Sequence, residues 1–309
     1  MTSNKKIIAV VHLYYKDMWP QIKEHLDSMS DYAYDLVVSM PKENSSIKET
    51  ILSFKNDTVF VESENVGYDI WPFVKVLKNI NLDDYDYLVK LHTKRDMGKI
   101  VAIIDNKYFF RGAKWREFLL SFVKDKKTFN TCISAFENDK TLGMVNNKRL
   151  FDTTSLKSKD PHQKFCLNKA KELLKENANL IAQPDSYVKY VAGTMFICRA
   201  SLLKPLLKMN IGIDNFSTAD RKNENDLAHV VERLFGWTIT SQGFKIADPF
   251  STFSDDLKNM PHSILCRIVT FPIRHRLVSK IFRFIFRIDK NEKVVCYRLF
   301  KVTIFRKKI

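Results

Sequence analysis

Two hydrophobic periods alternate along the first hundred residues, and this alternation limits the possible folds more than any other feature. Residues 7–11 read Ile-Ile-Ala-Val-Val, a short and fully apolar run that is typical of a strand buried on both faces. Similar runs predict strands at 35–39, 58–61 and 85–91, and helical patterns separate the strands at 19–28, 46–54 and 68–77. This β-α-β order predicts an α/β fold with a mostly parallel central sheet. Ligands bind such sheets outside the carboxyl ends of the strands.

The second half of the chain has a looser pattern. Helices are predicted at 115–123, 163–176 and 223–234, and strands at 142–145 and 191–198. A polar, acidic segment at 254–256 precedes a strongly basic stretch and indicates a boundary. We therefore expect one large domain over residues 1–255 and a basic tail over residues 256–309.

Positive charge is concentrated at the end of the chain. The formal net charge is +16, and residues 261–309 contain 13 Lys or Arg against two Asp or Glu. The first 260 residues therefore carry only +5. A net charge so close to zero over the first 260 residues argues against a nucleic-acid-binding protein with a basic face over its whole domain. It indicates a main domain followed by a basic tail.

The tail also has an amphipathic pattern. Arg276, Lys280, Arg283 and Arg287 share one helical face. The apolar positions beside that face are Leu277, Ile281, Phe284 and Ile288. We expect two short helices separated by Pro272 that bind an anionic membrane surface. The alternatives are a helical pair packed on the body and a nucleic-acid-binding segment, and we expect no nucleic-acid partner.

The cysteines and the apolar segments indicate a reducing compartment. Five cysteines are present, an odd number, widely spaced and without a CxxC motif, which is typical of small buried side chains in the cytosol. The apolar run at 7–11 ends at His12, and no cleavage site of a signal peptide follows. No stretch reaches the ~18 uncharged apolar residues of a membrane span. We expect a cytoplasmic protein.

A first candidate site follows the third predicted strand, in the segment 64–70 (Glu-Asn-Val-Gly-Tyr-Asp-Ile). Gly67 permits a tight turn and a close approach of ligand. Asn65 and Asp69 offer side-chain acceptors, and a helix amino terminus adds backbone donors. The segment is suited to holding the ribose or base of a nucleotide. The alternative is an Asx-type turn that caps a helix.

A second candidate site follows the fourth predicted strand, where His92-Thr93-Lys94-Arg95 comes directly after a buried run. Many nucleotide-sugar enzymes with this α/β order have Asp-x-Asp there, and the carboxylates hold a divalent cation on the diphosphate. Lys94, with Arg95 or His92, can neutralise a diphosphate directly. The alternative is an ordinary basic loop.

Two later segments carry further candidates. Gly193 and Thr194 interrupt an apolar strand, which indicates either a close approach of ligand or a bulge in a packed strand. Glu224 and Asp226 stand at the start of the helix predicted at 223–234, where a carboxylate is either a cap or a general base for a hydroxyl. Farther along that helix, Glu232 is expected to make only solvated or intrahelical pairs.

Together these segments resemble the rhamnan synthesis protein F family of bacterial polysaccharide glycosyltransferases. The resemblance spans roughly residues 5–250. The matching segments are 64–73, 85–94, 115–116, 192–196, 227–229 and 232–233. The most specific of them are Lys-Leu-His-Thr-Lys at 90–94 and Ala-Gly-Thr-Met-Phe at 192–196.

The resemblance implies a nucleotide-sugar transferase with a GT-A-like fold, peripheral on the inner face of the cytoplasmic membrane. Its partners would be a nucleotide-sugar donor and a lipid-linked saccharide acceptor of cell-surface polysaccharide or lipopolysaccharide, with rhamnose as the namesake sugar. The expected donor-binding residues are Asn65, Gly67, Tyr68, Asp69, His92, Thr93 and Lys94. The expected residues of the neighbouring pocket are Arg95, Gly193, Thr194 and His229.

The family usually has Asp-Gly-Thr before Leu-Ala-His, and this chain has Glu224-Asn225-Asp226 in that place. We expect Glu224 or Asp226 to be the general base of a single displacement with inversion. No metal-ligating residues and no cofactor are predicted, because Lys94 supplies the charge, although Mg²⁺ or Mn²⁺ stays an alternative. A catalytically inactive scaffold subunit of a polysaccharide-biosynthesis complex is the competing hypothesis.

Overall fold

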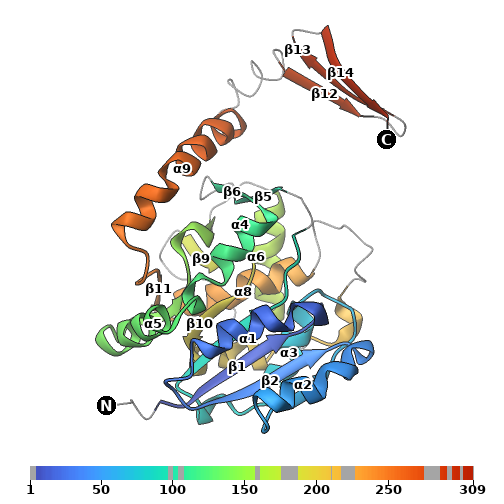
Figure 1. The fold of residues 1–309 in the computed structure, drawn as a ribbon. Helices are drawn as coiled ribbons and strands as arrows, with labels where there is room; N and C mark the ends of the chain where they lie inside the picture. Colours follow the sequence, from blue (N-terminus) through green and yellow to red (C-terminus); the bar gives the residue numbers. More distant parts are fainter. Residues whose placement is uncertain are drawn as a thin grey trace. The chain divides into compact units, whose positions relative to one another are not determined.

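The structure is a computed structural model in which two units each have their own internal contacts (Figure 1). One unit contains residues 1–106 and 110–251, and the other contains residues 107–109 and 252–309. The described residues are 5–96, 100–103, 108–156, 161–174, 187–209, 211–216, 227–274, 286–290, 294–299 and 302–308.

A seven-stranded sheet forms the centre of the first unit. Its strands, in spatial order, are β11 (Lys245–Ala247), β7 (Leu142–Val145), β10 (Phe196–Arg199), β4 (Tyr87–His92), β1 (Ile7–His12), β2 (Tyr34–Met40) and β3 (Val59–Glu62). β4, β1, β2 and β3 are parallel neighbours, as are β11 and β7, whereas β10 runs antiparallel to both β4 and β7. The predicted α/β fold with a mostly parallel central sheet is confirmed.

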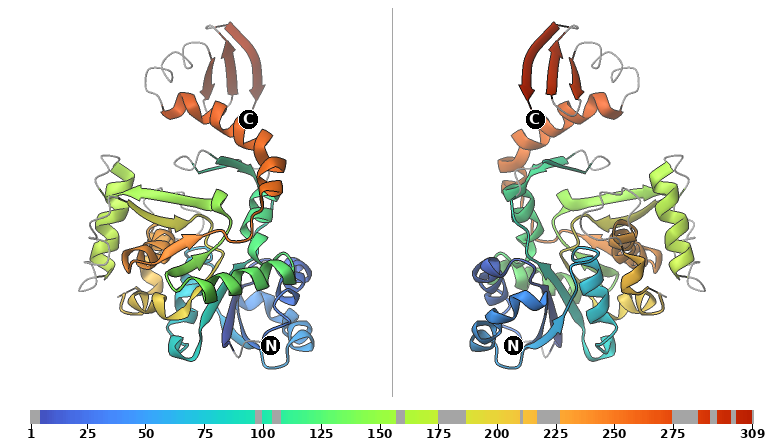
Figure 2. Two further views of the ribbon diagram at one scale, coloured as in Figure 1. Left: turned by 90° about the vertical axis from the view of Figure 1, so that its left-hand side faces the viewer. Right: turned by 90° about the vertical axis from the view of Figure 1, so that its right-hand side faces the viewer.

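Helices cover both faces of this sheet. The α-helices of the unit are α1 (Trp19–Asp27), α2 (Lys48–Phe54), α3 (Ile70–Leu77), α4 (Gly112–Leu119), α5 (Lys126–Asn138), α6 (Pro161–Leu174), α7 (Lys204–Leu207) and α8 (Leu227–Ser241). Short 3₁₀ helices occupy Lys16–Met18, Lys42–Ile47, Leu82–Asp84, Ser121–Val123, Lys148–Leu150, Ala200–Leu203 and Ile213–Asn215. Figure 2 shows α1 and α2 on one face of the parallel strands and α3 on the other, as right-handed crossovers require.

A small sheet of β8 (Phe151–Ser155) and β9 (Tyr187–Val191) completes the unit. Two further short strands are β5 (Ile100–Ile103) and β6 (Tyr108–Arg111). The strand predicted at 191–198 is therefore wrong as a single element. β9 ends at Val191, β10 begins at Phe196, and a turn separates them. Gly193 and Thr194 in this turn have φ values of +84° and +56°, a left-handed conformation that no strand can contain.

The core lies around the central strands and α3. Every residue of β1 and of β4 is buried. Seven of the eight residues of α3 are buried, and its proline stands in the first turn, where a helix tolerates proline. The ring of Phe73 on α3 packs edge-on against Phe235 of α8, with 5.2 Å between their centroids, and also against Phe196 of β10. This aromatic layer ties α3 and α8 to the sheet.

The second unit contains α9 (Phe253–Arg274) and an antiparallel sheet of β12 (Phe286–Lys290), β13 (Val294–Leu299) and β14 (Val302–Lys308). The predicted tail of helices is corrected in two respects. α9 continues through Pro272, because an interior proline costs a helix its own N–H bond without always ending it. Arg287 and Ile288 lie in β12, because the sequence beyond 286 is rich in β-branched and aromatic residues. Residues 275–285, including Arg276, Lys280 and Arg283, lie outside the described residues.

One face of α9 is apolar and exposed. Phe253, Leu257, Met260 and Ile264 recur at intervals of four, three and four residues, and each is about half exposed or more. Along the part of the chain that the structure describes, no helix combines the length and the apolar character that a bilayer crossing requires.

Candidate active site

The site lies at the carboxyl ends of β1 and β4, beside two turns that contain left-handed residues. Gly67 and Tyr68 have φ values of +65° and +55° and lead into α3. A Cβ atom on Gly67 would approach the ring of Phe216 to 2.7 Å, so the turn requires glycine. A Cβ atom on Gly193, in the second turn, would lie 2.6 Å from the Trp115 ring. Both turns are therefore closely packed from behind.

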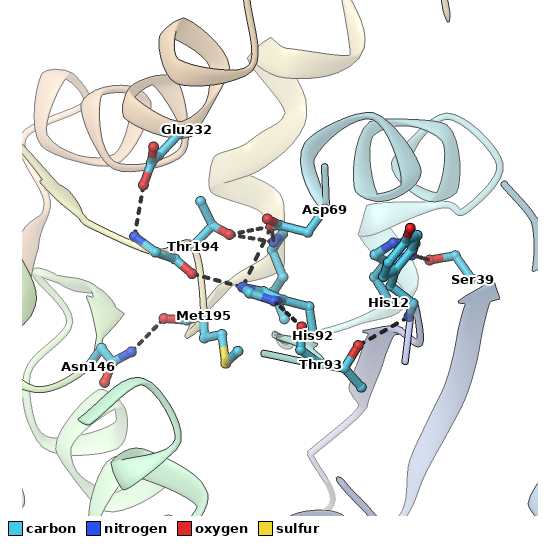
Figure 3. Close-up of polar contacts among 12 residues, drawn as sticks. His12, Ser39, Asp69, His92, Thr93, Asn146, Thr194, Met195 and Glu232 are labelled. Carbon is cyan, nitrogen blue, oxygen red and sulfur yellow. Dashed lines mark hydrogen bonds and ion pairs between the residues drawn. The ribbon is translucent and has the colours of Figure 1, made fainter. Parts of the chain in front are cut away.

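A buried ion pair joins these two turns (Figure 3). The Lys90 ammonium of β4 lies 2.5 Å from Asp69 Oδ2 and donates to Thr194 Oγ1 at 2.8 Å. The Thr194 hydroxyl donates to the same Asp69 oxygen. Burial alone would raise the pKa of the Asp69 carboxyl, but the charges of His92 and Lys90 and the two hydrogen bonds hold that pKa well below its usual range. Asp69 is an anion at any physiological pH.

His92 lies between the ion pair and the second turn. Its Nε2 atom is 3.0 Å from the Gly193 carbonyl oxygen and 3.8 Å from Asp69 Oδ2, and its Nδ1 atom is 3.2 Å from the Thr93 carbonyl oxygen. Burial lowers the pKa of the imidazole, although the Asp69 charge opposes this shift. His92 therefore fixes the turn at 193–194 against the end of β4.

Thr93 and Asn65 hold the loop that follows β1. The Thr93 hydroxyl accepts hydrogen bonds from the backbone N–H groups of Tyr14 and Tyr15, at 3.1 and 3.0 Å. The amide of Asn65 donates to the Tyr14 hydroxyl at 3.0 Å. At the end of β1, His12 is buried with Nδ1 3.1 Å from Ser39 Oγ, and burial lowers its pKa to about 3. His12 is an uncharged part of the wall.

Two adjoining cavities open over these residues. The first, of about 250 Å³, is lined by His12, Tyr14, Tyr15, Asn65, Tyr68, Asp69, His92, Thr93, Lys94 and Arg95. The second, of about 380 Å³, is lined by residues of both turns, by Trp115, Asp152 and Tyr190, and by Ala228, His229 and Glu232 of α8. Tyr68, Asp69, His92 and Lys94 border both cavities. A ligand that extends from one cavity into the other therefore passes Asp69 and Lys94.

The two exposed cations at the end of β4 have different surroundings. Arg95 pairs with Asp17 at 2.5 Å, and its guanidinium lies over the Tyr15 ring at 4.3 Å. The Lys94 ammonium makes no hydrogen bond or ion pair with any residue that the structure describes. Lys94 is therefore the cation that an anionic ligand can engage without breaking an existing pair.

A carboxylate that the sequence analysis set aside borders the second cavity. Glu232 makes the expected intrahelical pair, with Oε2 3.5 Å from His229 Nδ1. It is not a solvated side chain, because its Oε1 accepts a hydrogen bond from the Gly193 N–H at 2.8 Å. Burial alone would raise the pKa of Glu232, but the hydrogen bond from His229, the charge of Arg233 and the Gly193 N–H hold it below its usual value.

The structure brings together most of the predicted site residues. Asn65, Tyr68, Asp69, His92, Thr93, Lys94 and Arg95 line the first cavity, and Gly193, Thr194 and His229 line the second. Gly67 is part of the first turn and is packed against the ring of Phe216. Glu224 and Asp226 lie outside the described residues. Among the residues that are described, no three His, Cys, Asp or Glu side chains gather as a metal ion would require.

Comparison with known proteins identifies the family. Residues 1–244 match the model of the family described as rhamnan synthesis protein F. The chain belongs to this family. The match includes both turns, β4 and all of α8, so every described residue around the two cavities lies inside the matched region of the rhamnan synthesis protein F family.

Individual relatives of this member of the rhamnan synthesis protein F family are distant. Two curated relatives, each named "Uncharacterized protein WxcX" and found in two strains of Xanthomonas campestris pv. campestris, are 23% identical over 250 residues. These matches cover 77% of this chain and 32% of the relatives, so the chain spans about a third of their length. Among solved structures, S. aureus TarS 1–349 matches with a TM-score of 0.39 and 11% identity, covering 90% of this chain and 72% of TarS. The complex of TarS 1–349 with UDP matches with a TM-score of 0.36 and 13% identity over the same shares.

Lys90 and Glu232 belong to the site but were not among the predicted site residues. Thr194 was predicted for the neighbouring pocket, but its hydrogen bonds with Lys90 and Asp69 were not. A lysine inside an apolar strand is a clear signal of a buried ion pair, because an ammonium is almost never fully buried without a partner. Three of the five residues at 87–91 are Leu or Val, and this composition predicts burial of Lys90 with them. The partner Asp69 could not be predicted, since it lies 21 residues away on another element.

Proposed function

We propose that this protein is a glycosyltransferase that moves a sugar, with rhamnose as the first candidate, from a nucleotide-sugar donor to a lipid-linked or growing cell-surface polysaccharide acceptor. The observation that carries the proposal is a pair of adjoining cavities at the carboxyl ends of the strands, with the unengaged Lys94 ammonium on the border between them. Membership of the rhamnan synthesis protein F family supports the same reaction class.

The first cavity suits the donor. Lys94 is the group that neutralises the diphosphate and the charge that develops on it as the glycosidic bond breaks. Thr93 and His92 hold the surrounding backbone, while Asn65, Tyr68 and Asp69 offer polar and aromatic surfaces to the nucleoside or the sugar. A cation contributed by the chain itself makes the reaction independent of a divalent metal.

The second cavity suits the acceptor. A base there removes the proton from the attacking hydroxyl while the sugar leaves the diphosphate, and this single in-line displacement inverts the anomeric centre. Glu224 and Asp226, just before α8, are our proposed bases. Glu232 is a third candidate, because it is an ionised carboxylate that borders this cavity.

We also propose that the second unit holds the enzyme on the inner face of the cytoplasmic membrane. The apolar stripe Phe253, Leu257, Met260 and Ile264 on α9 supports this, since a helix with such a face lies in a bilayer interface. Residues 261–309 contain 13 basic and two acidic residues, and this excess of positive charge adds attraction to anionic lipids.

A thermal-shift screen against UDP-, GDP- and dTDP-linked sugars tests the proposal. A donor present at a hundredfold excess over its Kd stabilises the folded protein by about 2.7 kcal/mol, which raises Tm by roughly 5–11 °C in a domain of this size. The stabilising donor is then tested for sugar transfer and for slow hydrolysis.

Lys94→Met is expected to remove most of this shift. The matched control is Lys126→Met, which deletes an exposed lysine on α5 that pairs with Asp31 away from both cavities. The absence of a shift with every nucleotide sugar would refute the proposed function. Binding without transfer or hydrolysis would favour the inactive-scaffold alternative.

A further inference from the structure

Asp69 occupies a helix-capping position without capping the helix. It is the residue immediately before α3, where an aspartate usually accepts a hydrogen bond from the first turn, but its side chain makes no such bond. The carboxylate instead turns toward β4, and one oxygen, Oδ2, receives Lys90, the Thr194 hydroxyl and the nearby His92 ring. Helix capping therefore does not account for the carboxylate.

Lys90 neutralises the negative charge of the Asp69 carboxylate. Only 2% of the Lys90 side chain is exposed, and its ammonium faces the rings of Phe73 and Phe235 at 5.0 and 5.7 Å. Burial lowers the pKa of Lys90, while Asp69 opposes that shift and keeps the ammonium paired. An unpaired carboxylate beside Lys94 would repel a diphosphate, whereas the neutral Asp69–Lys90 pair does not.

The two oxygens of the Asp69 carboxylate differ in their hydrogen bonds. Oδ1 accepts no hydrogen bond from any described residue. The Asp69 side chain is 17% exposed, and it borders both cavities. An ionised carboxylate oxygen has no hydrogen to donate, so the ligand group that it binds must be a donor. Sugar hydroxyls are the donors that nucleotide sugars share whatever their base.

We infer that Asp69 Oδ1 accepts a hydrogen bond from a hydroxyl of the ligand, on the ribose or on the transferred sugar, and that Lys90 is the positioning residue that fixes and neutralises Asp69 for this task. This inference rests on the proposed function and names the chemical group that the site selects. The competing explanation is an ion pair that only joins the two turns.

Paired substitutions separate the two explanations. Lys90→Met leaves a buried, unpaired carboxylate, and it is expected to lower Tm by roughly 6–20 °C and to weaken donor binding. Asp69→Leu combined with Lys90→Met replaces both charges by apolar groups of similar size, which is often neutral for stability. We expect the double variant to regain most of the Tm but to bind the best nucleotide sugar of the screen roughly 10- to 100-fold more weakly than wild type.

The matched control is Ile133→Ala, which opens a cavity in the core on α5 away from the site. It is expected to lower Tm and to leave the Kd for the nucleotide sugar unchanged at a temperature where it is folded. Recovery of both Tm and Kd in the double variant would show that the pair is only structural and would overturn the inference.

Ligand analogues identify the hydroxyl and test the inference in the wild-type chain. The free nucleoside diphosphate lacks the sugar hydroxyls, and the 2′,3′-dideoxy analogue lacks those of the ribose. We expect one of these removals to weaken wild-type binding roughly tenfold or more, and to have little effect on the double variant. Equal affinity of the wild type for all three ligands overturns the inference but not the proposed function. Absence of any nucleotide binding by the wild type overturns both.

Discussion

Acid should destabilise this protein in part through the buried His12. His12 ends β1, lines the first cavity and is buried, and burial lowers its pKa from 6.5 to about 3. Between these two pH values the unfolded chain binds a proton at this position and the folded chain does not. The unfolded state therefore binds more protons, and the free energy of unfolding falls as the pH falls through this window.

The size of the effect follows from the shift. A difference of one in pKa between the folded and unfolded states is worth about 1.4 kcal/mol of unfolding free energy. The pKa of His12 is lower by roughly 3.5 in the folded state, so acidification from about pH 7 to about pH 3 removes about 4–5 kcal/mol of unfolding free energy. Between about pH 6.5 and about pH 4.5, the loss attributable to His12 is about 2.5 kcal/mol. This is a large part of the 5–15 kcal/mol, roughly, that stabilises a typical domain.

Urea denaturation at several pH values measures this loss. The wild type is expected to lose about 2.5 kcal/mol more of unfolding free energy than His12→Gln over that window, because glutamine has no proton to gain. Ser39→Ala is the matched control. It removes the hydrogen-bond partner of Nδ1 but leaves the imidazole buried, so the pH dependence of the wild type should persist. Parallel curves for wild type and His12→Gln would refute the reasoning.

Three further predictions concern catalysis and location. Lys94→Met should lower turnover roughly 10²–10³-fold, and wild-type transfer should survive EDTA; activity lost in EDTA and restored by Mn²⁺ or Mg²⁺ would contradict this. Among Glu224→Gln, Asp226→Asn and Glu232→Gln, the variant that removes the base should lower turnover about 10²–10⁴-fold with Tm retained, and normal rates in all three and in their combination would exclude these bases. A chain ending at Ser251 should keep donor binding but no longer co-sediment with anionic vesicles, because each basic residue removed from the membrane surface costs about 1 kcal/mol of binding. Equal partitioning of the long and short chains would exclude the membrane role.

The parallel half of the sheet was predictable because its strands are short, apolar runs. β1, β2 and β4 fall within two residues of the predicted bounds, since a strand buried on both faces consists mostly of apolar residues. α5 was not predicted, because Thr and Asn alternate with its apolar residues, and its cap at Asp125 is a local signal that occurs in many turns.

The candidate site was predictable only as separate pieces. Residues 64–70 and 92–95 follow two parallel strands, β3 and β4, so both segments come at carboxyl ends of the sheet, where sequence reasoning could propose them. The ion pair of Asp69 with Lys90 and the bond from Gly193 to Glu232 connect residues 21 and 39 positions apart through packing, which no local pattern encodes. The Gly193–Thr194 turn was missed for a different reason, because its flanking residues are as apolar as those of a continuous strand.

The position of β10 has a consequence for how the protein is made. β10 pairs antiparallel with β4, and Lys90 contacts Thr194 across 104 positions of sequence. A ribosome adding about 5–20 residues per second needs roughly 5–20 s to produce the intervening chain. During that time β4 is an edge strand with an apolar face and unpaired backbone groups, which is a surface prone to aggregation. A nascent chain stalled or truncated between residues 93 and 195 should therefore need a chaperone to stay dispersed, rather than persist as a small nucleotide-binding fragment.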